Sequence, residues 1–183
     1  MPTTREPSLR TLRNCLINRG GEVEKTKAWV PSYTLPADTF GLGVFDDPLG
    51  LRLQVFGTAA VTMPDTQVGY IQVASGGKTP QRVLFAQSMF GTLFWIMEWT
   101  DGSVQHFANA TAITAYSGRA DAALARFAIA FGEKCYLPYG SGLYASKIQE
   151  LSWNAGEDGE AFYDTSVHMG SAGSIVAMAE YLS

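Results

Sequence analysis

The alternation of apolar and polar positions is clearest between Phe85 and Phe107, where it predicts consecutive β-strands. Successive side chains of a strand point to opposite faces of its sheet. Between residues 93 and 99, one face would carry Leu93, Trp95, Met97 and Trp99, and the other Phe94, Ile96 and Glu98. Both faces are nearly all apolar, which is typical of a strand that lies inside a stack of sheets. We therefore expect sheets on both sides of this strand.

Turn signals around this strand predict a meander of at least three strands. Asp101-Gly102 is typical of a tight hairpin, because glycine readily adopts positive φ, and it should pair Trp95–Thr100 with Ser103–Phe107. Phe90-Gly91-Thr92 offers a second reversal upstream, and glycine-rich turns predict two further hairpins elsewhere in the chain. The structural turn residues that we single out are Gly20, Gly21, Asp101, Gly102, Gly140 and Gly142.

The remaining segments extend the β-rich pattern. We expect a half-exposed strand over Leu51–Gly57, another strand before Val73 and a short one within Ala110–Tyr116. Ala122–Phe131 is the one helix candidate, helical in its first turn and a strand afterwards. About ten to twelve strands fit, at the spacing of a propeller or sandwich. The predicted fold class is all-β and mostly antiparallel, with β-propeller-like blades or a partial propeller and at most one short helix.

The first twelve residues differ from the rest, so we expect an N-terminal arm over 1–12 and a single β-rich domain over 13–183. The arm is polar, contains prolines and shows no periodic burial, so it needs a partner to become ordered. Arg5 and Arg10 are candidate nucleic-acid contacts. Contact with neighbouring subunits and a solvated tail remain the alternatives.

Composition and charge narrow the function classes. The chain has 183 residues, 46% of them hydrophobic and 16% charged, which suits one packed globular domain. A net charge of −4 argues against a surface that grips phosphates, although a surface that lets DNA pass without binding it would carry such a charge. No apolar run approaches 18 residues and the amino terminus lacks a signal-peptide core, so we expect no membrane association and a place on the cytoplasmic side.

No cofactor or metal site is expected. Cys15 and Cys135 share no CxxC spacing and are interpreted as buried apolar thiols rather than a disulfide or ligands. Asn154, Asp158 and Glu160 resemble part of a calcium loop, but its twelfth position is Thr165 where a bidentate Glu is required.

The catalytic interpretations fail on geometry. Asp164, Ser166 and His168 would share one strand face, where alternate residues stand about 6.6 Å apart and project in parallel, so they cannot form a triad. A hydrolase would instead need a pocket that brings His106 or His168 to a distant Ser or Asp. We therefore predict that the protein is not an enzyme.

Several segments, taken together and in order, resemble one protein family. They are Asn14–Val30 with its Gly-Gly-Glu turn, Leu35–Leu42, Leu93–Phe107 with its Asp-Gly-Ser turn, Gly118-Arg119-Ala120, Lys134–Ser146, and Ser152-Trp153-Asn154 with Gly159. Over about Arg13 to Tyr181, this order is similar to that of the β-propeller tail proteins of short-tailed bacteriophages, the nozzle or hub family.

The resemblance implies a structural virion protein of the tail or head-to-tail connector. Such proteins form a homo-oligomeric ring, typically of six subunits, against other tail or connector proteins, and genomic DNA passes through its lumen during ejection without specific binding. It implies a place in the virion, after assembly in the host cytoplasm. Family members run to several hundred residues, whereas this chain spans only what would be the first blades. We expect another chain to supply the rest, or a distinct short connector, and in either case an obligate assembly.

A different class of protein remains open from the residues alone. A small β-sandwich that binds carbohydrate or another ligand could use exposed tryptophans as a stacking platform. The candidates are Trp29, Trp95, Trp99 and Trp153. Exposure of these side chains discriminates the two alternatives, because a connector should bury most of them.

Overall fold

The computed structural model describes residues 15–17, 23–25, 34–47, 50–59, 61, 63, 67–73, 76–169 and 173–179, and the chain divides into two compact units, Met1–Thr34 and Leu35–Ser183. In the first unit, β1 (Cys15–Ile17) and β2 (Val23–Lys25) pair in antiparallel, as the predicted hairpin requires. Its turn residues Gly20 and Gly21, and the arm residues Arg5 and Arg10, lie outside the described residues. The predicted arm ends at residue 12, whereas the two units meet at Thr34 and Leu35.

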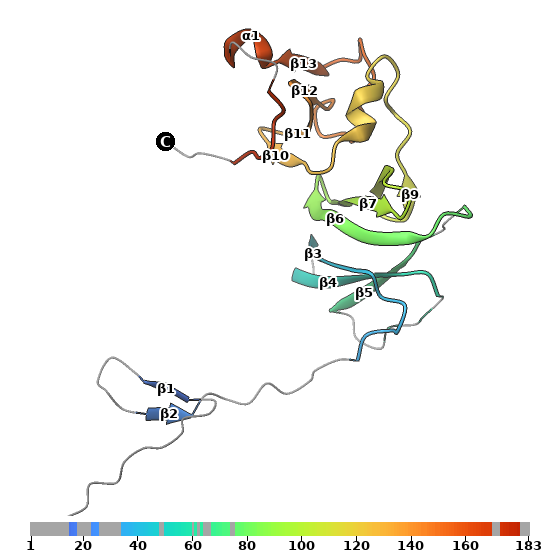
Figure 1. The fold of residues 1–183 in the computed structure, drawn as a ribbon, viewed down its shortest axis with the longest axis vertical. Coiled ribbons are helices and arrows are strands. Elements are labelled where there is room, and N and C mark those ends of the chain that lie inside the picture. The colour runs from blue at the N-terminus through green and yellow to red at the C-terminus, as the bar shows by residue number, and fades with distance from the viewer. Residues whose placement is uncertain are drawn as a thin grey trace, which may run out of the picture. The chain divides into compact units, whose positions relative to one another are not determined.

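Three sheets follow one another along the second unit (Figure 1). The first contains β3 (Gly41–Asp47), β4 (Gly50–Gly57) and β5 (Val68–Gln72). The second contains β6 (Pro80–Met89), β7 (Thr92–Trp99), β8 (Val104–Ala108) and β9 (Thr111–Ala112). The third contains β10 (Ile129–Phe131), β11 (Lys134–Tyr139), β12 (Gly142–Ala145) and β13 (Ala161–Asp164).

The fold is all-β and mostly antiparallel. The second and third sheets are simple meanders in chain order, and only β4 and β5 pair in parallel among the described strands. Helical structure in the described part of the chain is confined to a 3-10 turn, η1 (Ala120–Leu124), and a single turn, α1 (Ser166–Met169). The described sheets do not close on one another.

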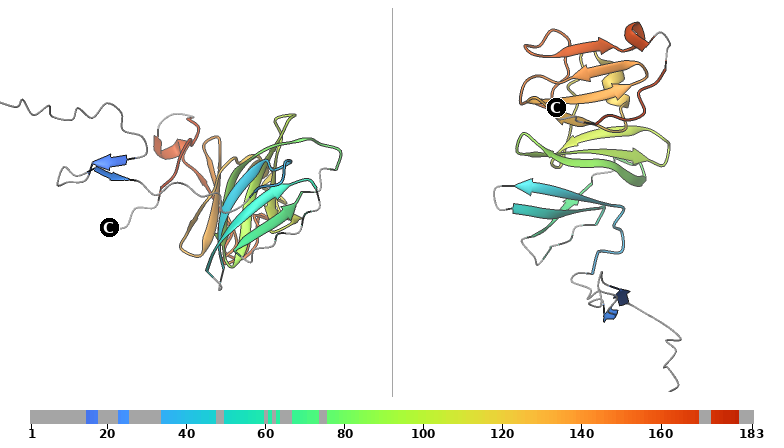
Figure 2. Two further views of the ribbon diagram at one scale, coloured as in Figure 1. Left: turned by 90° about the horizontal axis from the view of Figure 1, so that it is seen from below. Right: turned by 90° about the vertical axis from the view of Figure 1, so that its left-hand side faces the viewer.

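The two apolar faces of β7 enter two separate cores, as its pattern predicts. Leu93, Trp95, Met97 and Trp99 pack toward the first sheet and form the first core with residues such as Phe56. Phe94 and Ile96 pack toward the third sheet and form the second core with residues such as Leu137 and Trp153. The three sheets are thus stacked face to face, with β7 in the central layer (Figure 2, right).

The predicted turns on either side of β7 are also present. Asp101-Gly102 joins β7 to β8, with Gly102 at φ +80° and its N–H donating to the Trp99 carbonyl. Phe90-Gly91 joins β6 to β7. In the third sheet, Gly140 lies in the turn between β11 and β12 at φ +56°, and Gly142 begins β12 opposite Tyr139.

The first and second sheets approach each other most closely at their first strands, β3 and β6. A Cβ atom added to Gly41 would lie 2.7 Å from Val83 Cβ, and one added to Gly43 would lie 2.7 Å from Ala86 Cβ. Elsewhere between the same sheets the space is filled by aromatic rings, with the centroids of Phe56 and Trp95 4.6 Å apart. Glycine at one edge and aromatic residues across the rest give this pair of sheets a wedge-shaped cross-section.

Three predicted elements differ from the structure. Leu51–Gly57 was expected to be half-exposed, but Gln54–Gly57 is buried on both faces, with Phe56 in the core between the first and second sheets. The strand expected within Ala110–Tyr116 is only β9. The predicted strand face of Asp164, Ser166 and His168 is wrong, because β13 ends at Asp164 and the other two residues belong to α1. By contrast, Ala122–Phe131 contains the end of η1 followed by β10, as its dual pattern suggests.

Candidate functional site

His106 is a buried structural link rather than a catalytic base. Its Nε2 lies 2.8 Å from the Ala125 carbonyl oxygen and its Nδ1 lies 2.5 Å from the Tyr116 hydroxyl. A carbonyl only accepts, so Nε2 carries the proton and Nδ1 accepts from the tyrosine. Burial lowers the pKa of His106 to about 4, which keeps this neutral tautomer at pH 7. The ring therefore joins β8 to the segment that follows η1.

The tryptophans of the second unit do not form a binding platform. Trp95, Trp99 and Trp153 are all buried. Trp95 stacks on Phe107 with ring centroids 4.1 Å apart, and Trp153 stacks on Tyr116 at 5.7 Å. A sugar needs an exposed ring face, so these three side chains cannot supply one. Trp29 lies outside the described residues.

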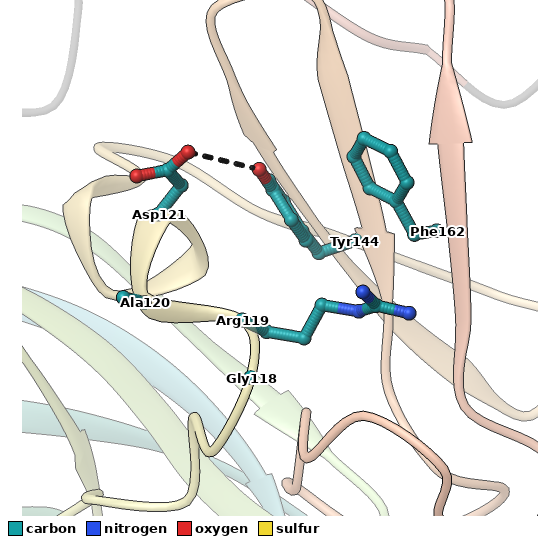
Figure 3. A pocket seen from close by; sticks show the side chains of 6 residues that line it. All are labelled: Gly118, Arg119, Ala120, Asp121, Tyr144 and Phe162. Atoms are coloured by element: carbon teal, nitrogen blue, oxygen red, sulfur yellow. Dashed lines mark hydrogen bonds between the residues drawn. The ribbon is translucent and has the colours of Figure 1, made fainter.

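A shallow hollow of about 280 Å³ lies beside η1, and its polar groups already have partners (Figure 3). The Arg119 guanidinium lies 5.4 Å from the Phe162 ring centroid, and its Nε lies 2.6 Å from Glu160 Oε1. The Tyr144 hydroxyl donates to Asp121 across 3.4 Å. Within the part of the chain that the structure describes, no buried side-chain nitrogen or oxygen lacks a partner. The Arg119 guanidinium, the Tyr144 hydroxyl and one oxygen of Asp121 are therefore already engaged in contacts within the protein.

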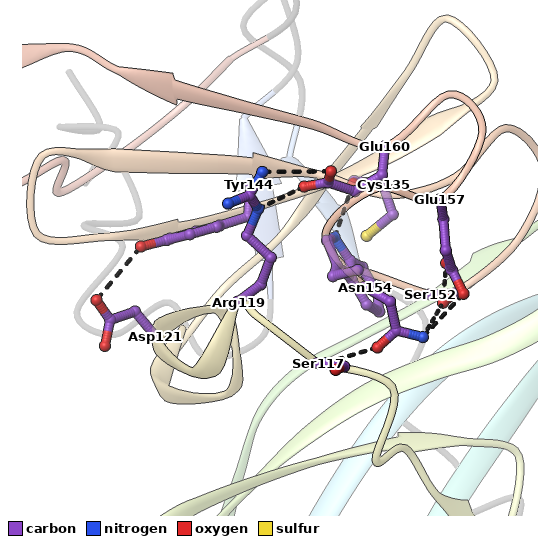
Figure 4. A network of polar contacts seen from close by, with 10 residues as sticks. Ser117, Arg119, Asp121, Cys135, Tyr144, Ser152, Asn154, Glu157 and Glu160 are labelled. Atoms are coloured by element: carbon purple, nitrogen blue, oxygen red, sulfur yellow. Dashed lines mark hydrogen bonds and ion pairs between the residues drawn. The ribbon is translucent and has the colours of Figure 1, made fainter.

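Two of the three residues that resemble part of a calcium loop, Asn154 and Glu160, are engaged in polar contacts with other side chains (Figure 4). Asn154 Oδ1 accepts from the Ser117 N–H at 2.6 Å, and Asn154 Nδ2 donates to Glu157 at 2.8 Å. The Ser152 hydroxyl donates to the second oxygen of Glu157. These contacts fasten the turn after residue 151 to the segment before η1. The described residues contain no group of three or more His, Cys, Asp or Glu side chains that could hold a metal ion.

Asp164 and Ser166 touch, but as a local cap. Asp164 Oδ1 accepts from the Ser166 backbone N–H at 2.9 Å and from its hydroxyl at 2.7 Å, at the start of α1. The side chain of His168 lies outside the described residues. The thiol of Cys135 is free and buried, and burial raises its pKa, so it is not a reactive nucleophile.

A buried carboxylate connects the second and third sheets. The Glu98 side chain on β7 is only 7% exposed, and its two oxygens pair with Arg82 on β6 and Arg126 in the segment before β10. The Arg82 Nε lies 2.6 Å from Glu98 Oε2. Two cations thus neutralise one buried anion at the end of the second core.

The largest unexplained features are the outer faces of the first and third sheets. Register places on the first end face the side chains of Leu42, Val44, Leu53, Val55, Val68 and Tyr70. It places on the last end face those of Ile129, Phe131, Tyr136, Leu143, Ala145, Ala161 and Tyr163. Gln72 on the first of these faces and Lys134 on the last are polar, so both rows are mostly but not entirely apolar. Within the second unit, the described cores lie between the sheets and on the opposite side from these two faces.

Exposure on the two end faces is concentrated at a few large side chains. Leu42 and Val44 on β3 are 51% and 55% exposed, and Phe131 and Tyr163 are 53% and 50% exposed. Leu42 and Val44 lie two residues apart on the same face of β3, which makes this face a candidate interaction surface. The alternation in Leu42–Val44 places both side chains on one face but does not say whether that face is covered, and the binding hypothesis drawn from the sequence rested on the tryptophans instead.

Comparisons with protein-family models, curated proteins and solved structures found no match. Among the described residues, no helix is long and apolar enough to cross a bilayer. Function must therefore be argued from the sheets, their faces and their charges.

Proposed function

We propose that this chain is a structural component of a bacteriophage tail or head-to-tail connector. Its sheets act as propeller-like blades, and its copies assemble into a ring around the DNA channel. The observation that carries the proposal is the stack of sheets in chain order, with large apolar side chains half exposed on the outer face of each end sheet. Exposed apolar side chains at both ends of the stack favour contact with a neighbour, as in a protein that functions within an assembly.

The sheet topology supports the blade interpretation. The second and third sheets are four-stranded antiparallel meanders that follow one another along the chain. Repeated four-stranded meanders packed face to face are the building unit of a propeller. The close approach of the first two sheets at Gly41 and Gly43, with aromatic rings filling the space elsewhere, is compatible with blades that splay outward from a common centre.

Charge and chemistry support a non-enzymatic role in contact with passing DNA. The formal net charge of −4 disfavours retention of phosphates. The polar groups that could have supplied catalysis, such as His106 and Cys135, are buried within structural contacts. No observation favours the carbohydrate-binding sandwich, because the three described tryptophans are buried.

Light scattering of the full chain, alone and mixed with the product of the adjacent gene, tests this function. We expect a ring-sized assembly, or a stable complex that forms only with the neighbour, and electron microscopy of that species should show a central lumen. A neighbour heated to unfold it serves as the control for nonspecific association. A monomer that ignores the intact neighbour, or an assembly without a lumen, would contradict the proposal.

A further inference from the structure

We propose that the first end face of one copy packs against the last end face of the next copy, in a head-to-tail contact. The inference deepens the proposed ring by assigning the two surfaces that join its subunits. The closure of copies into a ring rests on the proposed function. The contact between two copies rests only on the side chains of the two end faces.

The first end face is suited to cover another sheet. Leu42 pairs across the strands with Val55, and Val44 pairs with Leu53, so two aliphatic rows lie side by side. Leu42 and Val44 are half exposed, whereas Val55 is buried. The accessible apolar surface is therefore a ridge along β3, the strand whose opposite side already contacts β6.

The last end face presents aromatic side chains near its two edges. Phe131 lies on the edge strand β10 and Tyr163 on the edge strand β13, each about half exposed. The chain itself covers one end of the sheet, where the Ile175 N–H donates to the Gly140 carbonyl at 2.8 Å and residues 174–178 line a hollow with Leu143. Phe131 and Tyr163 remain outside this cover. An aliphatic ridge on one copy can therefore lie between aromatic groups on the other.

The stack itself indicates which two faces should meet. Within the chain, each sheet directs one face toward the sheet before it and the other toward the sheet after it, and every core joins a following face to a preceding face. The first end face is a preceding face and the last end face is a following face. Repeating the same contact between copies makes a heterologous interface, in which two different surfaces meet, rather than a two-fold dimer.

The size of the face predicts a weak single contact. The two longer strands of the first sheet have 7 and 8 residues. Three strands spaced about 4.8 Å apart and rising about 3.4 Å per residue give a face of about 15 by 24 Å. Because only part of the face is accessible, two such faces bury at most roughly 700 Å² in projection, below the range of about 1,200–2,000 Å² for stable pairs. Assembly should therefore depend on concentration and strengthen when a ring closes.

Two double variants of the full chain test the contact by complementation. L42K with V44K blocks the first end face, and F131K with Y163K blocks the last. Sedimentation velocity at about 100 µM should show each variant alone at least about tenfold weaker in self-association than the wild type. An equimolar mixture should form dimers and nothing larger, because one intact face remains on each partner. Leu124→Lys, on an exposed apolar residue of η1 outside both faces, is the matched control and should assemble normally.

Other outcomes would overturn the inference. A wild type that stays monomeric at this concentration would show that the faces do not join copies, as when another segment of the chain covers the first end face. Self-association retained by either double variant alone would indicate a two-fold contact through the other face. Circular dichroism melting of each variant excludes misfolding, and the mixture is a second safeguard, since misfolded partners could not complement.

The two proposals can fail separately. If the two double variants form dimers when mixed, but the wild type shows neither a lumen nor a complex with the neighbour, the head-to-tail contact is supported and the tail or connector function is rejected. A lumen-containing complex whose assembly is unchanged in both double variants would reject the contact and sustain the function.

Discussion

At the scale of single residues, the buried polar side chains that the structure describes all have hydrogen-bond partners within the protein. His106 donates to Ala125 and accepts from Tyr116, so its neutral form is matched at both nitrogens. The sequence could identify His106 as one of two histidines but not its partners, because Ala125 contributes a backbone carbonyl that carries no side-chain signal. The predicted burial of Cys135 is confirmed, since a cysteine within an apolar strand needs no partner to be buried.

The depressed pKa of His106 predicts a loss of stability in mild acid. The unfolded chain takes up a proton at this side chain below pH 6.5, but the native protein does so only near pH 4. The free energy of unfolding should therefore fall by up to about 3 kcal/mol between pH 6.5 and 4 through this group alone. NMR titration should show one histidine with a pKa near 4, and a His168→Ala variant assigns the signal. A histidine pair titrating entirely above pH 6 would contradict this expectation.

Glu98 predicts a non-additive pair of substitutions. Arg82→Ala or Arg126→Ala alone leaves one cation beside the buried carboxylate and should cost about 1 kcal/mol or less, since both arginines are largely exposed. The double variant leaves the carboxylate buried and unpaired and should cost about 3–5 kcal/mol.

Urea denaturation of the four proteins in this double-mutant cycle measures the coupling between Arg82 and Arg126. Lys78→Ala removes an exposed pair with Asp101 and serves as the control, with an expected change near zero. Strict additivity of the two arginine substitutions would count against the shared carboxylate.

At the scale of elements, the strands with the strongest patterns were predictable and their contacts with other sheets were not. The meander from β6 to β8 followed from a strand that is apolar on both faces and from glycine at its turns. The burial of Gln54–Gly57 could not be predicted, because alternation reports a strand's own faces and not what covers them. The parallel pairing of β4 with β5 could not be predicted either, because alternation does not report which strand pairs with which or in which direction.

The two kinds of glycine in the second unit should respond differently to alanine. Gly43→Ala places a methyl group 2.7 Å from Ala86 Cβ and should cost about 1–3 kcal/mol by forcing β3 away from β6. In Gly102→Ala the new methyl group meets no atom within 4 Å, but the alanine must adopt φ +80°. This backbone strain should lower the free energy of unfolding by about 1 kcal/mol.

Thermal denaturation with Ala86→Gly in the background separates these two causes. Removing the Ala86 methyl should rescue most of the Gly43→Ala loss and none of the Gly102→Ala loss. Equal rescue of both variants, or of neither, would be inconsistent with close strand approach at Gly43.

At the scale of the whole molecule, stability should reside in the second unit. Every core residue that the structure describes lies within 40–153. The fragment 35–183 should therefore melt within about 2 °C of the full chain when followed by circular dichroism, because a large shift would need lost core contacts. A much lower melting temperature would mean that residues 1–34 contribute to the packing.

The candidate surfaces are the part of the molecule that was least predictable from the sequence. The binding hypothesis drawn from the sequence rested on large aromatic residues, yet Trp95 and Trp99 are buried between the sheets. The exposed ridge consists of Leu42 and Val44, whose composition is that of any half-buried strand. Only the position of a strand within the stack decides whether such a row is core or surface.

The central strand β7 also constrains the order in which a growing chain can fold. Residues up to Ala112 complete the first core, but the second core needs Leu137, Tyr144 and Trp153, which leave the ribosome later. Until then, Phe94 and Ile96 have no cover. The nascent chain therefore passes through a stage with an apolar sheet face in water, which is the kind of surface that chaperones bind and that aggregates when synthesis is fast.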